Sequence, residues 1–330
     1  MVPFGYLFLQ SPPNEELPVP DYRTRSDEGV PRPTPNLVET VFEMQRRKDW
    51  MREYLVDEGQ GELSFVDSAS VGDDINQLAV QMREALNLTE RWAEGQTTWE
   101  EALRFLREQV EEAGILVFVN GVVGNNTHRK LDPEEFQGFV FVDRIVPLIF
   151  VNGADYKVAQ MFTMAHELAH VWVGQSALFD LVATDPADIA VERYCNAVAA
   201  EFLVPADMLE RTWPTAPPGD AAFVSLARRF KVSPVVIARR AKDRHMINAD
   251  EFFNFYKRYM NRERKKQESR GQGGNFWRTQ NLKLGRRFGR AVIAAAEEGR
   301  ISYSEAYGFT QLFGETFDKY ARRLREQDTE

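Results

Sequence analysis

The sequence has little of what disulfide-linked, secreted or membrane-spanning proteins need. Its 330 residues include one cysteine, so the chain forms no internal disulfide, which fits a reducing cytoplasm. No apolar run is long enough to span a bilayer, and the start, MVPFGYLFLQSPP, lacks the basic region of a secretion signal. No internal repeat is evident. We therefore expect a cytoplasmic globular protein that does not contact membranes and holds two domains, or one domain with sizeable appendages.

Histidine is also scarce, and its placement is informative. The chain has four histidines, and two of them stand in an H-E-x-x-H motif that runs from His166 to His170. Apolar residues at helical spacing over residues 156–172, followed by Gly174, predict a helix here. Both imidazoles then lie on one helical face and can reach a single metal ion, while Glu167 can take a proton from a metal-activated water. The alternative is two unrelated histidines on a buried helix.

A catalytic zinc site with two histidines needs a third protein ligand. The next predicted helix, residues 188–203, offers Glu192 twenty-two residues after His170. Asn196 lies on the same helical face, four residues further on, where its amide can steady a ligand imidazole. Glu192 is the predicted third ligand, with Glu201 as a rival nearer the end of the helix. A solvent-exposed charge on an amphipathic helix is the alternative for Glu192.

The segments FTMAHELAH (162–170) and VERYCNAVAAEFLVP (191–205) resemble the ImmA/IrrE family of metallopeptidases. The resemblance covers residues 74–210 well. It implies that the two motif histidines and Glu192 bind one Zn²⁺ ion and that Glu167 is the catalytic base. It also implies a zinc-dependent endopeptidase that cleaves a specific regulatory protein, a helix-turn-helix repressor, under stress.

The chain is also similar to longer ImmA-type proteins that carry an XRE helix-turn-helix domain at their front. In those proteins a segment like LFLQSPPNEELPVPDYRT follows the DNA-binding domain, and this chain begins almost at that segment. We therefore expect a long-type member whose DNA-binding head is absent. Such proteins look as if they are encoded beside PIN-domain nuclease toxins. This gives a second hypothesis, an antitoxin-like or regulatory binding protein that neutralises such a toxin.

The predicted elements indicate an α+β protein with a zincin-like core, made of a three-stranded sheet and the motif helix. Residues 1–70 are expected to form a proline-rich arm and one helix, and residues 71–212 the metallopeptidase domain. Residues 213–250 have the pattern of a helix-turn-helix module, in which two helices are joined by a short turn. Residues 251–330 are expected to form a basic helical C-terminal region. The three strands are expected at Ile115–Asn120, Gly138–Val142 and Leu148–Val151.

Charge is spread unevenly along the chain. Residues 257–290 hold twelve Lys or Arg and two acids, a formal charge of +10, against −19 for the remainder. This asymmetry favours an acidic or polyanionic partner, and a solvated surface is the alternative. A third hypothesis is therefore a DNA-binding regulator that uses residues 257–290 and Arg239–Lys242.

The loop between the first two strands, residues 121–137, is long, polar and carries His128. We predict that His128 contacts substrate or an oxyanion, with a solvated surface histidine as the alternative. This loop and the basic C-terminal region are both expected to border the metal cleft, with the proline-rich arm elsewhere.

Overall fold

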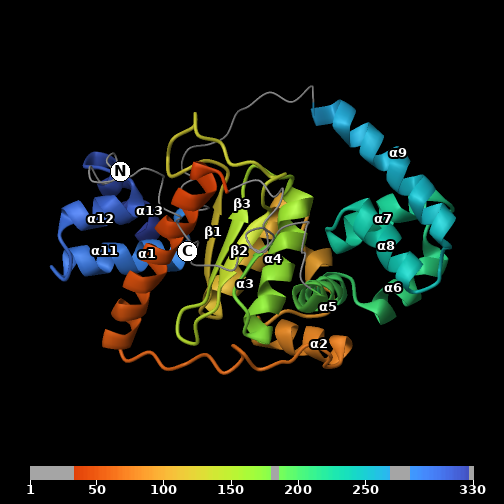
Figure 1. Cartoon of the computed structure of the whole chain (residues 1–330), viewed down its shortest axis with the longest axis horizontal. Helices are drawn as coiled ribbons and strands as arrows, with labels where there is room; N and C mark the ends of the chain where they lie inside the picture. The colour runs from red at the N-terminus through yellow and green to blue at the C-terminus, as the bar shows by residue number, and fades with distance from the viewer. Residues whose placement is uncertain (1–32, 180–185, 268–282, 327–330) are drawn as a thin grey trace, which may run out of the picture.

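The protein's computed structural model describes residues 33–179, 186–267 and 283–326. Within them one mixed sheet separates two groups of helices (Figure 1). The strands are β1 (Leu116–Asn120), β2 (Gly138–Phe141), β3 (Leu148–Asn152) and β4 (Ala177–Phe179), in the order β1-β3-β2-β4. β1 pairs with β3 in parallel, and β2 pairs antiparallel with both β3 and β4.

The described helices are α1 (Pro35–Asp57), α2 (Ile75–Ala85), α3 (Trp99–Glu112), α4 (Lys157–Val173), α5 (Pro186–Leu203), α6 (Ala206–Thr212), α7 (Asp220–Phe230), α8 (Pro234–Asp243), α9 (Ala249–Gln267), α11 (Arg286–Glu297), α12 (Tyr303–Thr310) and α13 (Glu315–Glu326), with short 3₁₀ turns η2 (Trp92–Gly95) and η3 (Trp213–Thr215). The two helices predicted at residues 156–172 and 188–203 are present as α4 and α5. The mixed α and β content expected from the sequence is confirmed.

The sheet has one strand more than the three that the sequence predicted. β4 spans only Ala177–Phe179, three residues after the glycine that ends α4. Such a short segment shows no period that would distinguish a strand from a loop. It is a strand because the backbone returns along β2, where Ala177 pairs with Val140.

Apolar residues cover both faces of the three longer strands. Along β1, Leu116 and Phe118 pack into one core, and Val117 and Val119 pack into the other. Neighbouring side chains of a strand point to opposite faces, so a continuous apolar run is buried only where helices cover both sides. The continuous apolar run ILVFVN fits a sheet that helices cover on both faces.

The face of the sheet that carries Val117 and Val119 packs against α3 and α4. α4 in turn packs on α5, and α5 on α2. Further along, α7, α8 and α9 form a compact unit, in which the Phe223 and Phe255 rings lie 4.6 Å apart. This first core holds the H-E-x-x-H helix.

The opposite face of the sheet is covered by α1 and the C-terminal helices (Figure 1). Phe288 of α11 is fully buried and packs its ring against Phe118 of β1 at 5.5 Å. The expectation that the C-terminal region borders the metal cleft is therefore wrong for residues 283–326, because their apolar faces are buried on the other side of the sheet. Residues 268–282 and the arm before residue 33 lie outside the described residues.

Glu111, near the end of α3, connects the two sides of the sheet. Its carboxylate accepts the Arg286 backbone N–H at 2.8 Å and so caps the start of α11. Gly285 makes this possible, because a Cβ there would lie 2.7 Å from the Glu111 Oε1 atom. Burial raises the pKa of Glu111 to about 7, although Arg107 and backbone N–H groups of α11 oppose the shift.

This raised pKa predicts that stability falls as pH rises. The folded state holds the Glu111 proton more tightly than the unfolded chain, whose value is 4.5. The contribution of Glu111 to the free energy of unfolding is therefore complete below pH 4.5 and is lost as pH rises through 7. The total loss is about 3 kcal/mol. Urea unfolding between pH 5 and pH 8 should show a shallower decline in Glu111→Gln. The control variant Glu112→Gln, at an exposed neighbouring residue, should keep the pH dependence of the unmodified protein. If all three proteins show the same pH dependence of unfolding free energy, Glu111 is not its source.

Candidate metal centre

α4 presents the motif histidines from inside the first core. Met161, Leu168 and other apolar side chains bury the helix, and Gly174 ends it in the left-handed conformation at φ 79°. His166 and His170 are both fully buried, one helical turn apart, with their Nε2 atoms separated by 3.0 Å. Two imidazoles held this closely on one face can share one cation.

α5 brings a carboxylate to the same point. Glu192 Oε2 lies 3.0 Å from His166 Nε2, and Glu192 Oε1 lies 3.2 Å from His170 Nε2. The three residues are buried, and their ligand atoms all lie within 4.8 Å of one another. The structure thus brings together His166, His170 and Glu192, and they form a group that could hold a metal ion.

The environment sets His166 and Glu192 in the protonation states that metal binding needs. Burial lowers the pKa of His166 to about 4, against the opposing hydrogen bond from Glu192, so its imidazole is neutral at pH 7. Burial would raise the pKa of Glu192, but hydrogen bonds and charge interactions with both histidines outweigh it and bring the pKa to about 2. Neutral imidazoles and an ionised carboxylate are the forms that bind divalent cations.

Glu167 lies next to this group and is fully buried. Burial, together with the nearby charge of Glu192, raises the pKa of Glu167 well above its ordinary value. Neither of its carboxyl oxygens has a hydrogen-bond partner among the described residues. A buried carboxyl group with no protein partner is a strong proton acceptor and is costly to maintain without a role.

Gly138 of β2 lets the sheet approach Glu167 closely. A Cβ at this position would lie 2.6 Å from the Thr163 Cγ2 atom and 3.0 Å from Glu167 Oε1. Any side chain at position 138 would therefore displace the motif helix or the Glu167 carboxyl group. The sequence contained no signal for this contact beyond a glycine at the start of a predicted strand.

Two neighbours of Glu192 on α5 also reach the centre or its surroundings. The Asn196 side chain hydrogen-bonds to the His166 side chain. Cys195 is fully buried in the first core, and burial raises the pKa of its thiol. A neutral, buried thiol behaves as a small apolar residue, which fits its packing.

The structure separates Glu192 from its rival, Glu201. Glu201 is buried in an ion pair with Arg240 of α8, and it accepts the Ala206 backbone N–H at 3.1 Å, near the start of α6. Arg83 of α2 donates to the carbonyl oxygens of Glu201 and Phe202, each at 3.1 Å, and so fixes the end of α5. These partners were not predictable, because an arginine on an amphipathic helix normally faces water.

His128 is not part of the buried group. It is exposed in the loop between β1 and β2, and its backbone N–H donates to Asn126 at 3.0 Å. The loop is tied to the C-terminal helices through Asn125, which donates to the Gln311 carbonyl at 2.9 Å and accepts from Lys283 at 3.0 Å. A substrate contact by His128 stays a prediction.

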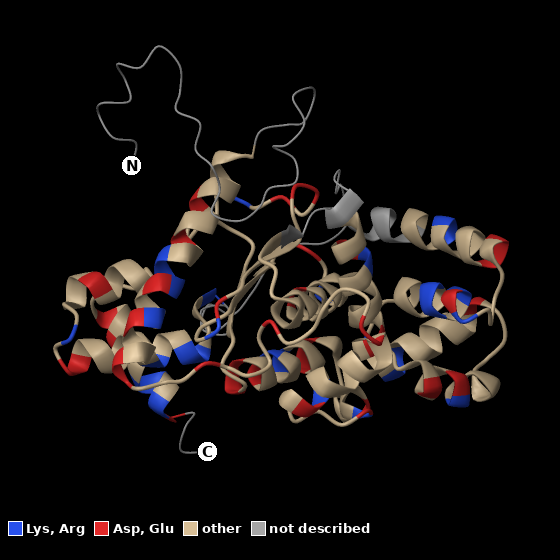
Figure 2. Cartoon of the chain, turned by 60° about the horizontal axis from the view of Figure 1, so that its bottom comes forward, with Lys and Arg blue, Asp and Glu red and all other residues tan. Residues whose placement is uncertain are grey.

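Two basic residues of the helix-turn-helix-like module, Arg240 and Lys242, are engaged within the chain, whereas Arg239 is exposed. Besides its ion pair, Arg240 donates to the Val204 carbonyl at 3.1 Å, and Lys242 lies 5.2 Å from the Phe252 ring. On α1 and the C-terminal helices, Figure 2 shows residues of both charge signs interspersed. Phosphate contacts by Arg240 or Lys242 would break these interactions. Most side chains of residues 257–290, the other segment of the DNA-binding hypothesis, lie outside the described residues.

Part of the chain is similar to known proteins. Residues 110–242 match the family described as IrrE N-terminal-like domain, Peptidase_M78. This part of the chain is therefore similar to the ImmA/IrrE family of metallopeptidases. It is 35% identical over 95 residues to the radiation response metalloprotease IrrE of Deinococcus radiodurans, a match that spans 26% of this chain and 28% of that protein.

The ImmA/IrrE match runs from the end of α3 to α8. It therefore contains His166, His170 and Glu192, which we call the metal group. Residues 284–323 match a second family, described as a domain of unknown function (DUF8813). That segment contains α11 and α12 and covers the sheet face opposite the metal group. No helix in the described residues combines the length and apolar character needed to cross a membrane.

Proposed function

We propose that the chain is a zinc-dependent endopeptidase that cleaves a specific regulatory protein. The observation that carries the proposal is the buried group of His166, His170 and Glu192 with the unpartnered Glu167 carboxyl group beside it. The likeness to a metalloprotease over 95 residues supports a peptidase. A group of this kind has no apparent role in a protein that only binds a partner.

The donor set fits a zinc ion. Ligand atoms about 2.0–2.1 Å from a tetrahedral zinc ion lie roughly 3.3–3.4 Å from one another. In this structure the two Nε2 atoms lie 3.0 Å apart, and they lie 3.0 and 3.2 Å from the two different oxygens of Glu192. Small shifts of the side chains would therefore accommodate the ion. Two imidazoles and one carboxylate form a ligand set found in zinc peptidases, and three protein ligands leave a position open for chemistry.

In the proposed mechanism zinc would supply a Lewis acid that activates water and polarises the scissile carbonyl. Glu167 would accept a proton from the attacking water and pass it to the leaving amine. Burial raises the pKa of this carboxyl group, which makes it a stronger proton acceptor than an ordinary glutamate. Asn196 would hold the His166 ring in position through its hydrogen bond.

The substrate we propose is a helix-turn-helix repressor, in keeping with the resemblance of the two motifs. β4 lies at one edge of the sheet, and an extended peptide can pair with such an edge. Selection by strand pairing would restrict cleavage to proteins that present an extended segment. Incubation of the zinc-loaded protein with a candidate repressor, followed by mass spectrometry, tests this: a single zinc-dependent cut is expected, and cleavage at many unrelated sites would contradict it.

Paired substitutions test the third ligand. Glu192→Gln should reduce zinc content at a fixed zinc concentration by tenfold or more (about 1.4 kcal/mol), because it removes the charged ligand. Glu201→Gln should keep its zinc but lose about 3–5 kcal/mol of stability, since Arg240 would be left buried without its counter-ion. Equilibrium dialysis with metal analysis and urea unfolding measure the two effects. Zinc loss in Glu201→Gln without zinc loss in Glu192→Gln would reverse the assignment.

A further inference from the structure

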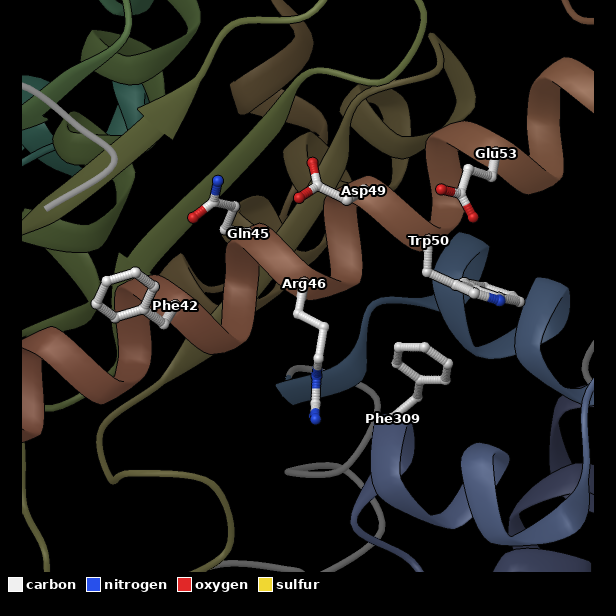
Figure 3. Close-up of a pocket in the computed structure, with 7 residues that line it drawn as sticks. All are labelled: Phe42, Gln45, Arg46, Asp49, Trp50, Glu53 and Phe309. Carbon is white, nitrogen blue, oxygen red and sulfur yellow. The ribbon is translucent and has the colours of Figure 1, made fainter. Parts of the chain in front are cut away.

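We propose that a groove on the outer face of α1 binds the chain's own proline-rich arm, residues 11–20. The groove has a volume of about 470 Å³ and lies between α1 and the end of α12 (Figure 3). It is remote from the metal group, because α1 covers the other face of the sheet. Its lining consists of one continuous face of α1 and one ring of α12, formed by Phe42, Gln45, Arg46, Asp49, Trp50, Glu53 and Phe309.

Aromatic rings, one arginine and the carboxylates of Asp49 and Glu53 line the groove. The Trp50 and Phe309 ring centres lie 5.0 Å apart, and 41% of the Phe42 surface is exposed. Arg46 stacks over the Phe309 ring at 5.6 Å and donates to the Gly308 carbonyl at 3.3 Å, yet it remains exposed. Grooves lined by aromatic rings bind proline-rich segments in the polyproline II conformation, which loses little entropy on binding.

The arm has the complementary composition. Its sequence, SPPNEELPVP, contains four prolines, two glutamates and no basic residue. The prolines can pack on the exposed rings of the groove, and Glu15 or Glu16 can pair with the Arg46 guanidinium group. Arg46 is the one cation in a lining that also holds Asp49 and Glu53, so this ion pair and the packing of the prolines on the rings are the contacts that would hold the arm.

The connecting chain is long enough for docking. Residues 21–32, twelve in number, join the arm to Pro33, where the described chain begins. Twelve extended residues span about 40 Å. The far end of the groove, Glu53, lies eighteen residues beyond Pro35 on α1, which is about 27 Å along the helix. A tether of this length keeps the arm at a high effective concentration near the groove.

Disulfide trapping in the full chain tests the docking. One variant carries Asn14→Cys with Gln45→Cys, which lies in the groove. Its control carries Asn14→Cys with Glu39→Cys, which is exposed on α1 and closer to Pro33 but outside the groove. The native Cys195 is fully buried and does not compete. Under mild oxidation, followed by mass spectrometry, we expect the Gln45 pair to close within one chain about tenfold faster than the Glu39 pair.

A charge exchange then tests the role of Arg46. Arg46→Glu should slow closure of the Gln45 pair, and adding Glu15→Lys with Glu16→Lys should restore it. Closure of the Glu39 pair at an equal or greater rate would show that the arm moves freely and would overturn the proposal. Disulfides that form only between chains would overturn it too, because the groove would then bind a second copy. A rate unaffected by Arg46→Glu would contradict the proposed charge pairing.

Discussion

Replacing Glu167 with Gln should lower the rate of peptide cleavage by about 100- to 10,000-fold while zinc stays bound. The expected size is the usual contribution of a general acid–base residue. Gln keeps the shape of the side chain but cannot accept the proton, and Glu167 lies beside the metal group without being one of the three buried ligands. Cleavage of a repressor substrate and zinc content, measured on the same preparation, test the two halves of the prediction.

The matched control is Glu84→Gln, which alters an exposed carboxylate on α2. It should leave both cleavage and zinc content unchanged. If Glu167→Gln cleaves at the rate of the unmodified protein, Glu167 is not the base. If it loses zinc as well as cleavage, the carboxyl group contributes to metal binding, contrary to the assigned geometry.

Replacing Phe288 with Ala should destabilise the protein by about 3–5 kcal/mol. Phe288 of α11 is fully buried and contacts the rings of Trp50 and Phe118 at 5.6 and 5.5 Å. Its removal leaves a cavity between the C-terminal helices, α1 and the sheet, and a loss of this size is a large fraction of ordinary domain stability. Urea unfolding, followed by circular dichroism, measures the change.

Phe313→Ala is the control, because 68% of that phenylalanine is exposed. Its effect should stay within about 0.5 kcal/mol. Equal stability losses in the two variants would show that α11 does not pack on the sheet. By the same reasoning, removal of residues 284–330 should unfold the sheet and lose the metal.

The local sequence determined the helices and strands and the composition of the metal group. Thr98 and Glu101, three residues apart, form the capping box that opens α3, and Gly174 ends α4. The i, i+4 spacing of His166 and His170 determined their shared helical face, because it depends only on helix geometry. These features follow from contacts within a few residues of the chain, so no tertiary information was needed.

Tertiary packing decided what depends on residues far apart in the sequence. The sequences of the three predicted strands do not decide which face of the sheet the C-terminal helices cover, because both faces are apolar. Glu192 and Glu201 both lie on α5, and only the ion pair of Glu201 with Arg240, thirty-nine residues away, separated their roles. The fourth strand and the close approach of Gly138 to Glu167 arise from backbone proximity across the sheet. A single sequence carries no local signal for such contacts, because they are selected by packing and burial of the whole fold.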